Sequence, residues 1–324
     1  MGKISDIDLS LANIYRSWYD FRVGKRASRD IDFFSYHLET ELFSLYRDLN
    51  FGTYRHGEYR YFTVTDSKRR HIAVANVRDR VVHRLLYNYL VEIYDQSFIY
   101  DVWSCRKNKG VIGAVKRTQK LLKKHPLSFV WRADITKFFD SVNQVILLKI
   151  LERKLDNTKA FKLLEEVIAS YTTPAGQQAA GIAIGNLTSQ IFANVYLNEL
   201  DHFVSHTLKP QAYIRYGDDF IAITSRQSQA HDFRRQIGEF LDTKLALKLN
   251  PKNNIIIPTG RGVHFLGLGI FPYGWRLNKR NLSRAKQRVN QKNVASYYGL
   301  VKAHSNYKRM REFQWHLFNK FNDK

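Results

Sequence analysis

Two adjacent acids, Asp218 and Asp219, stand in the middle of residues 212–224, AYIRYGDDFIAIT. The aromatic and β-branched residues on both sides favour two strands, and Gly217 allows the backbone angles of a tight turn between them. Neighbouring carboxylates repel each other, so an acid pair inside an apolar hairpin requires a compensating cation. A divalent metal ion would supply that charge, whereas the alternative is an ordinary solvated Gly-Asp-Asp turn.

A third acid, Asp134, follows the apolar segment 129–131 and ends a basic region. Residues 102–133 contain nine Lys and Arg and no acid. The positive charges of such a run repel one another unless an anion binds. Apolar residues are interleaved at helical spacing, which predicts a helix whose basic face contacts a phosphate backbone. A lone acid after a strand is commonly a helix cap, but the basic run before Asp134 favours a functional role.

Three segments in chain order resemble the palm motifs of reverse transcriptases. They are residues 134–140, DITKFFD, residues 181–190, GIAIGNLTSQ, and residues 216–219, YGDD. The form IGNLTSQ at residues 184–190 is similar to diversity-generating retroelement reverse transcriptases, whereas the related group II intron and retron enzymes usually carry Pro-Gln-Gly there. The resemblance extends from about Tyr54 to Leu268, most of the chain.

The resemblance implies an α+β right-hand polymerase fold with fingers, a palm with an antiparallel sheet and a small helical thumb. We expect an N-terminal helical extension at residues 1–50, fingers at 51–133, a palm with fingers insertion elements at 134–275, and a basic thumb at 276–324. Helical spacing of apolar residues predicts helices in the extension and near residues 191–204 and 231–249, and residues 59–74 read as a β-hairpin. No RNase H or endonuclease domain is expected after the thumb.

The acids suit nucleotidyl transfer by two Mg²⁺ ions. Mg²⁺ takes oxygen ligands and shares them with substrate phosphates, so few protein ligands suffice. By resemblance, Asp134, Asp218 and Asp219 are the catalytic residues. Asp134 and Asp218 would bridge the metals, the carbonyl of Ile135 would add a ligand, and Asp219 would support them. Neighbouring residues of a strand face opposite sides, so the two hairpin acids should not be equivalent.

The resemblance also places the substrates. A ring at Phe139 would clash with a ribose 2′-hydroxyl and select deoxynucleotides, whereas viral RNA polymerases generally carry an acid there. Ile184 stands where other reverse transcriptases usually have Gln, and one lost hydrogen bond of about 0.5–1.5 kcal/mol predicts reduced fidelity; the alternative is that Ile184 only packs in the palm. Nucleotide binding is expected from Lys68, Arg70, Arg80, Phe139, Ile184, Gln190 and Lys252, and a primer grip from Phe265, Leu266 and Gly267. Lys252 could instead be a surface lysine, and the basic residues at 68–80 could belong to a solvated turn.

Composition agrees with a nucleic-acid partner. The 324 residues carry a formal net charge of +23, and 44% of them are hydrophobic, so the chain is globular and strongly basic. The single Cys105 rules out an internal disulfide. No apolar run is long enough to span a membrane and no secretion signal is recognisable, so we expect a cytoplasmic protein. The thirteen Lys and Arg of residues 276–324 suit contact with a duplex backbone.

The expected partners are an RNA template, a DNA or RNA primer and dNTPs, and the resemblance implies an accessory variability protein that supports retroelement-driven diversification. Two alternatives stay open. A phage-defence or retron-like reverse transcriptase would share this chemistry. A non-catalytic RNA-binding scaffold would be expected to have lost its acids, yet all three are present.

Overall fold

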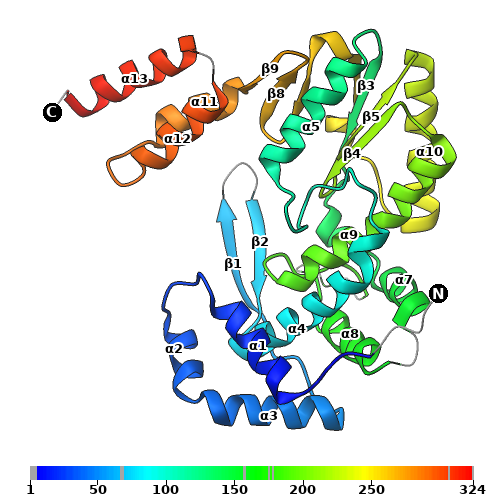
Figure 1. Ribbon diagram of the computed structural model, residues 1–324, viewed down its shortest axis with the longest axis vertical. Coiled ribbons are helices and arrows are strands. Elements are labelled where there is room, and N and C mark those ends of the chain that lie inside the picture. Colours follow the sequence, from blue (N-terminus) through cyan, green and yellow to red (C-terminus); the bar gives the residue numbers. More distant parts are fainter. Residues whose placement is uncertain are drawn as a thin grey trace. The chain divides into compact units, whose positions relative to one another are not determined.

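The computed structural model describes residues 6–65, 69–155, 158–173, 176, 179–305 and 307–322 (Figure 1). The chain divides into two compact units, each assembled from separate stretches. Unit 1 comprises Met1–Tyr100, Ile135–Phe203 and Gly238–Lys248, and unit 2 comprises Asp101–Asp134, Val204–Ile237 and Leu249–Lys324. The predicted domains, with boundaries at residues 51, 134 and 276, are continuous stretches of chain, whereas the two units are each made of several stretches. The predicted boundaries therefore stay predictions.

Unit 1 is mainly helical and is built around α4 (Val77–Tyr94). Apolar residues at helical spacing along α4, from Val81 to Leu90, are almost completely buried, and the helix contacts α1, α2 and α9. The helices before residue 52 confirm the predicted N-terminal helical segment. The bounds are α1 (Leu11–Arg22), α2 (Arg29–Tyr36), α3 (Leu38–Phe51), α6 (Phe138–Ser141), α7 (Gln144–Leu155), α8 (Lys159–Ala169) and α9 (Leu187–His202), with a short 3₁₀ turn at Asp95–Ser97.

A two-stranded hairpin belongs to the same unit. β1 (Arg60–Thr65) and β2 (Arg69–Val74) are antiparallel, with Arg60 opposite Val74, which confirms the hairpin predicted for residues 59–74. The residues between the two strands, Asp66, Ser67 and Lys68, lie outside the described residues.

Unit 2 contains the predicted antiparallel sheet, in the strand order β4-β5-β3-β6. A second sheet has the order β7-β8-β9, and helix α5 (Val111–Lys124) contacts strands of both (Figure 1). One apolar cluster joins Val130 and Ile221 of the first sheet with Phe265 and Ile270 of the second. The strands are β3 (Phe129–Ala133), β4 (Ala212–Tyr216), β5 (Asp219–Thr224), β6 (Ile255–Pro258), β7 (Val263–Phe265), β8 (Leu268–Phe271) and β9 (Gly274–Leu277).

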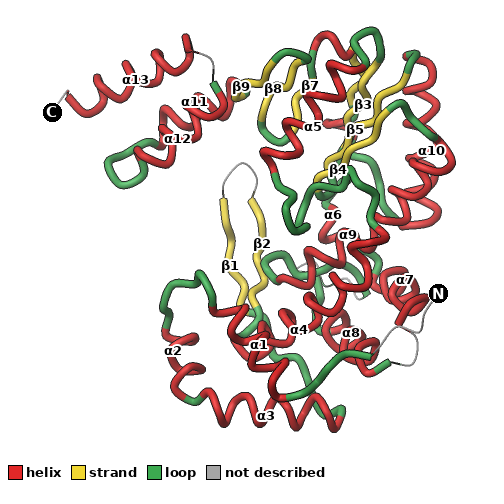
Figure 2. Tube along the Cα trace, in the orientation of Figure 1, coloured by secondary structure: helices red, strands yellow, loops and turns green. Residues whose placement is uncertain are grey.

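Helices follow and connect these sheets. Helix α10 (Gln227–Leu245) runs from unit 2 into unit 1, close to the predicted span of 231–249. After β9 the chain is helical, as predicted for the basic C-terminal segment, with α11 (Lys279–Arg288), α12 (Val294–His304) and α13 (Tyr307–Asn322) (Figure 2). Shorter helical turns cover Phe203–Leu208, Pro251–Asn253 and Thr259–Arg261. Within the described part of the chain, no helix combines the length and apolar character that a membrane crossing requires.

Candidate active site

The β4–β5 hairpin presents the acid pair at its tip. Tyr216 pairs with Asp219 across the hairpin, which leaves Gly217 and Asp218 as the turn. Gly217 has a φ of 64°, in the left-handed region that glycine adopts without strain, so the predicted need for glycine is confirmed. Its amide donates to Ser104 Oγ at 2.9 Å, and its carbonyl accepts from Arg215 Nη1 at 2.9 Å. Two side chains therefore fix the turn that carries Asp218.

Asp134 follows β3 directly, as the sequence predicts, and is 9% exposed. Its Oδ2 accepts a hydrogen bond from Asn253 Nδ2 at 2.7 Å, and its main-chain carbonyl accepts from the amide of Asn250 at 2.9 Å. Its Oδ1 is buried and has no hydrogen-bond partner among the described residues. A buried carboxylate oxygen without a partner is costly, so this atom is a candidate ligand position.

Asp219 is held by an arginine that the sequence did not single out for this role. Arg132 Nε and Nη2 donate to the two carboxylate oxygens of Asp219 at 3.0 and 2.8 Å. Arg132 pairs with Ile221, and residues two apart on a strand share a face, so Arg132 and Asp219 project from the same side of the sheet. Burial raises the pKa of Asp219 to about 6, since it outweighs the lowering by Arg132, and the charges of Asp134 and Asp218 raise it further. The three acids thus share one electrostatic environment.

These residues fit Mg²⁺ by their chemistry. Carboxylate oxygens are preferred Mg²⁺ ligands, and the unpartnered Oδ1 of Asp134 is such an oxygen. The described residues contain no ready-made group of three or more His, Cys, Asp or Glu side chains around one metal position. Mg²⁺ sites in nucleotide-processing enzymes usually rely on one or two carboxylates together with substrate phosphates, so two acids suffice.

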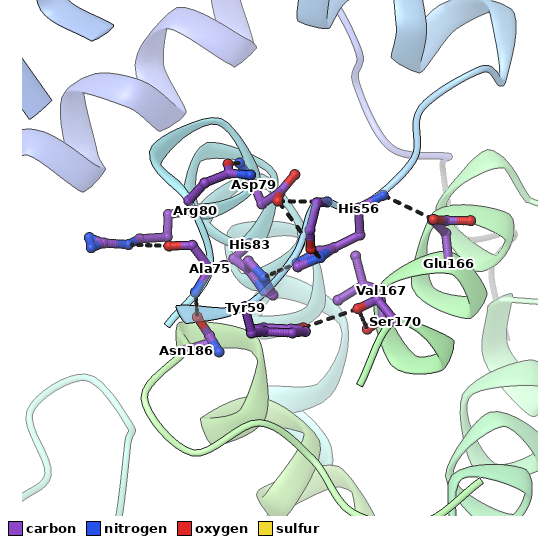
Figure 3. A network of polar contacts seen from close by, with 12 residues as sticks. His56, Tyr59, Ala75, Asp79, Arg80, His83, Glu166, Val167, Ser170 and Asn186 are labelled. Atoms are coloured by element: carbon purple, nitrogen blue, oxygen red, sulfur yellow. Dashed lines mark hydrogen bonds and ion pairs between the residues drawn. The ribbon is translucent and has the colours of Figure 1, made fainter. Parts of the chain in front are cut away.

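The segment around Ile184 is fixed to the end of β2 within unit 1. The carbonyl of Ile184 accepts from the amide of Ala73 at 3.0 Å. The buried Asn186 donates from Nδ2 to the carbonyl of Ala73 at 2.8 Å and accepts at Oδ1 from the amide of Ala75 at 3.2 Å (Figure 3). Gly185 has a φ of 115°, and a Cβ there would lie 2.7 Å from Ile72 Cγ2. The loop is therefore locked by its backbone and by Asn186, and the Ile184 side chain is half-buried.

The other predicted nucleotide-binding residues of unit 1 occupy different places. Arg80 and Gln190 line one pocket of about 250 Å³. Arg70 is exposed on β2, and Phe139 is half-buried on α6 with its ring 5.3 Å from that of Phe138. Neither of these lines the pocket, and Lys68 lies outside the described residues.

In unit 2, Lys252 is exposed in the turn Pro251–Asn253, between the two asparagines that contact Asp134. The predicted primer grip forms the β7–β8 hairpin, with Leu266 and Gly267 at its tip, both at positive φ. The Phe265 side chain is completely buried. Asn281 Nδ2 donates to the carbonyl of Gly267 at 2.9 Å, so α11 holds this tip.

Sequence reasoning missed the residues that position the acids. The role of Arg132 could have been predicted from strand alternation. Arg132 stands two residues before Asp134 and projects from the same side of the sheet as Asp219. Ser104 comes from a loop, Asn253 comes from the short helical turn Pro251–Asn253, and Arg215 is a fully buried charge on β4. Their contacts depend on tertiary structure, for which the sequence carries no local signal.

The chain is similar to several known proteins. A family model described as reverse transcriptase (RNA-dependent DNA polymerase) matches residues 62–270. Protein YkfC of Escherichia coli is 23% identical over 245 residues, 64% of this chain and 64% of YkfC. Group II intron-encoded protein LtrA of Lactococcus lactis subsp. cremoris is 20% identical over 302 residues, 72% of this chain and 50% of LtrA. The chain thus spans less than two thirds of the length of either relative.

Solved structures show the same fold. Apo telomerase from Candida tropicalis matches with a TM-score of 0.54 at 13% sequence identity, over 80% of this chain and 56% of that chain. Telomerase from Candida albicans, in complex with a fragment of telomeric RNA, matches with a TM-score of 0.53 at 14% identity, over 84% and 57% of the two chains. At such identities the likeness concerns the fold alone, and it confirms the predicted α+β right-hand polymerase fold.

Proposed function

Because the chain belongs to the reverse transcriptase family, we propose that it is an RNA-directed DNA polymerase, which extends a primer with deoxynucleotides on an RNA template. The observation that carries the proposal is the buried Asp134 Oδ1, which lacks a partner and lies in the same electrostatic environment as Asp218 and Asp219. Such a carboxylate group suits a divalent cation better than it suits a structural turn, because a structural turn needs no unpartnered buried oxygen.

Asp134 and Asp218 would hold two Mg²⁺ ions together with the carbonyl of Ile135. When bound, the ions stabilise negative charge on the reacting phosphate and lower the pKa of the primer 3′-hydroxyl. Asn253 orients the Asp134 carboxylate through Oδ2. Asp219 supports the site from its bidentate pair with Arg132, which keeps a positive charge beside the acids. Lys252 would lie near the leaving pyrophosphate and provide its proton.

We propose the diversity-generating type of this activity, with reduced fidelity. The motif IGNLTSQ supports it, and so does Ile184, whose side chain cannot donate or accept the hydrogen bond that a glutamine would make. Phe139 would exclude ribonucleotides, and the β7–β8 hairpin would contact the primer. Sequencing of extension products tests the type. Ile184→Gln should lower the misincorporation rate several-fold. The restored hydrogen bond would add about 0.5–1.5 kcal/mol to the discrimination between correct and incorrect nucleotides. Equal error rates would favour a defence-associated or retron-like enzyme.

The proposed partners follow from charge and family. A formal net charge of +23 suits an RNA template and a primer duplex, and an acidic accessory variability protein would complement the same surface. The proposed location is the cytoplasm.

Primer extension on an RNA template with Mg²⁺ and dNTPs tests the activity. Asp218→Asn should abolish extension, because it removes a metal-ligating charge and leaves the hairpin in place. Asp232→Asn is the matched control, since Asp232 is an exposed acid on α10 outside the site. Extension that persists in Asp218→Asn would overturn the proposal, and so would wild-type protein that shows no extension with or without an accessory protein.

A further inference from the structure

A pocket of about 250 Å³ in unit 1 is lined by several positively charged side chains. Its lining includes Phe21, Lys25, Arg80, Arg84, Asn186 and Gln190, which come from α1 and the loop after it, from α4, and from the start of α9. Three of these six side chains are cationic. Lys25 and Arg84 have no role in the proposed polymerase chemistry.

One aromatic ring brings two of the cations together. Lys25 Nζ lies 4.9 Å from the centre of the Phe21 ring, and Arg80 Cζ lies 5.3 Å from it. Burial lowers the pKa of Lys25, and the charges of Arg80 and Arg84 lower it further, so the three cations repel one another. Cation–π contact compensates this repulsion only in part.

The acids of the described residues leave this cluster largely without counter-charge. Across the described ranges, no ion pair involves Lys25, Arg80 or Arg84. The carboxylate of Asp30 acts on Arg80 only at a distance, because Asp30 is paired with Arg60 at 3.5 Å. The site therefore has charge available for an anion from outside the chain.

Donors are available as well. Arg84 Nε is buried and has no hydrogen-bond partner among the described residues, which is an unfavourable state for a charged donor. Arg80 donates from Nε to the carbonyl of Ala75 at 3.2 Å, which fixes the guanidinium. Figure 3 shows the far end of the Arg80 side chain directed away from the network of His56, Asp79 and His83. Arg80 is thus held in place by its hydrogen bond to Ala75, and Arg84 offers a buried donor that no described residue accepts.

We propose that this pocket binds a phosphate group, with Lys25, Arg80 and Arg84 as its donors and Gln190 at its rim. Phosphate oxygens accept charge-assisted hydrogen bonds from lysine and arginine, and arginine offers a fork that matches two of them. The phosphate belongs either to the backbone of a bound RNA strand or to the triphosphate of a nucleotide. The inference deepens the proposed function and rests on it for the choice of these two ligands.

Binding measured without catalysis tests the pocket. Single-stranded RNA carrying a fluorophore is titrated in EDTA by anisotropy, and dATP is titrated separately by calorimetry. The test variants are Lys25→Ala and Arg84→Ala. The controls are Lys149→Ala and Arg47→Ala, which remove exposed charges of the same kind from α7 and α3 outside the pocket.

Each test variant should weaken binding of one ligand about tenfold relative to its control, the cost of losing a charge-assisted hydrogen bond. If the ligand is RNA, the slope of log affinity against log salt should become shallower by about 0.7, since one phosphate contact is lost. Loss confined to RNA identifies the backbone as the source, and loss confined to dATP identifies the triphosphate.

Test variants that bind both ligands as their controls do would overturn the inference. Lys25 is exposed, so its alanine variant is expected to fold. Primer extension by wild-type protein separates this failure from failure of the proposed function. If wild-type protein extends the primer but the test variants bind as their controls do, only the phosphate pocket is refuted. If the test variants bind more weakly than their controls but wild-type protein does not extend the primer, only the polymerase activity is refuted.

Discussion

The guanidinium of Arg132 on β3 donates two hydrogen bonds to the carboxylate of Asp219 on the neighbouring strand β5, at 3.0 and 2.8 Å. Both side chains are less than one fifth exposed. The pair places one permanent positive charge beside a group of three acids, and that charge is hydrogen-bonded to Asp219. Asp134 Oδ1 is buried and has no hydrogen-bond partner among the described residues, and for this reason we propose Asp134, together with Asp218, as the ligands of divalent cations.

Removal of one partner of this pair should be strongly destabilising. Arg132→Met leaves Asp219 buried without its cation, and the free energy of unfolding should fall by about 3–5 kcal/mol. The double variant Arg132→Met with Asp219→Asn should lose less than the sum of the two single variants, because no charge then stays buried. Urea unfolding of the four proteins at neutral pH measures this coupling. Additive losses would show that the two side chains do not interact.

Asn253 should control metal affinity without being a ligand. Its Nδ2 is the hydrogen-bond donor to Asp134 Oδ2, and residues that orient a metal-binding carboxylate typically affect affinity or activity by about 10–100-fold. Asn253→Ala should therefore raise the Mg²⁺ concentration needed for half-maximal primer extension, with recovery at high Mg²⁺. Gln227→Ala, on the exposed start of α10, is the control. An unchanged Mg²⁺ dependence would contradict the positioning role.

Asn186 should hold β2 to the Ile184 segment. Its side chain satisfies the carbonyl of Ala73 and the amide of Ala75, and Asn186→Ala leaves both backbone groups without these partners, at about 1–3 kcal/mol each. Amide hydrogen exchange in residues 70–76 should accelerate, whereas exchange in the β4–β5 hairpin should not. Equal protection of residues 70–76 in variant and wild type would show that Asn186 is dispensable there.

A buried histidine pair links the segment before β1 to α4 and α9 (Figure 3). His56 Nε2 lies 3.1 Å from His83 Nε2, and His83 Nδ1 lies 2.5 Å from Thr188 Oγ1. His56 Nδ1 lies 2.6 Å from the carbonyl of Gly57, which can only accept. With both rings neutral, His83 Nε2 therefore donates to His56, and Thr188 donates to His83 Nδ1.

Acid should weaken the fold through His83. Burial, followed by the nearby His56 and Arg80, lowers the pKa of His83 from 6.5 to about 3. Between these values the unfolded chain binds a proton that the folded chain does not, so the free energy of unfolding falls as the pH decreases from 6.5 toward 3. His83→Gln should reduce this slope by up to about 1.4 kcal/mol per pH unit. His231→Gln, on the exposed part of α10, should not, and an unchanged slope in His83→Gln would contradict the assignment.

Periodicity and turn chemistry were enough to predict the β1–β2 and β4–β5 hairpins, the helical extension, and the strand that directly precedes Asp134. Each is encoded locally, by alternation, by helical spacing or by a glycine at positive φ, as at Gly217. The sequence also indicated that the two hairpin acids differ. The two acids indeed occupy different positions: Asp219 begins β5 and pairs with Arg132, whereas Asp218 stands in the turn.

Tertiary contacts could not be predicted in the same way. The basic run of residues 102–133 predicted a helix with one basic face for a phosphate backbone. Two arginines of the run instead pair with acids, Arg132 with Asp219 and Arg117 with Asp101 at 2.8 Å. Both acids lie outside the run, so its lack of internal counter-charges gave no sign of these pairs. The contact of Asn253 with Asp134 likewise spans more than a hundred residues.

Metal-directed cleavage tests the central claim most directly, that Asp134 and Asp218 hold divalent ions. Fe²⁺ takes the place of Mg²⁺, and ascorbate with peroxide then cuts the backbone near bound iron. Cuts should appear around residues 134 and 218, should decrease as Mg²⁺ is added in competition, and should vanish in Asp218→Asn but not in Asp232→Asn. Cuts elsewhere, or an unchanged pattern in Asp218→Asn, would contradict the account.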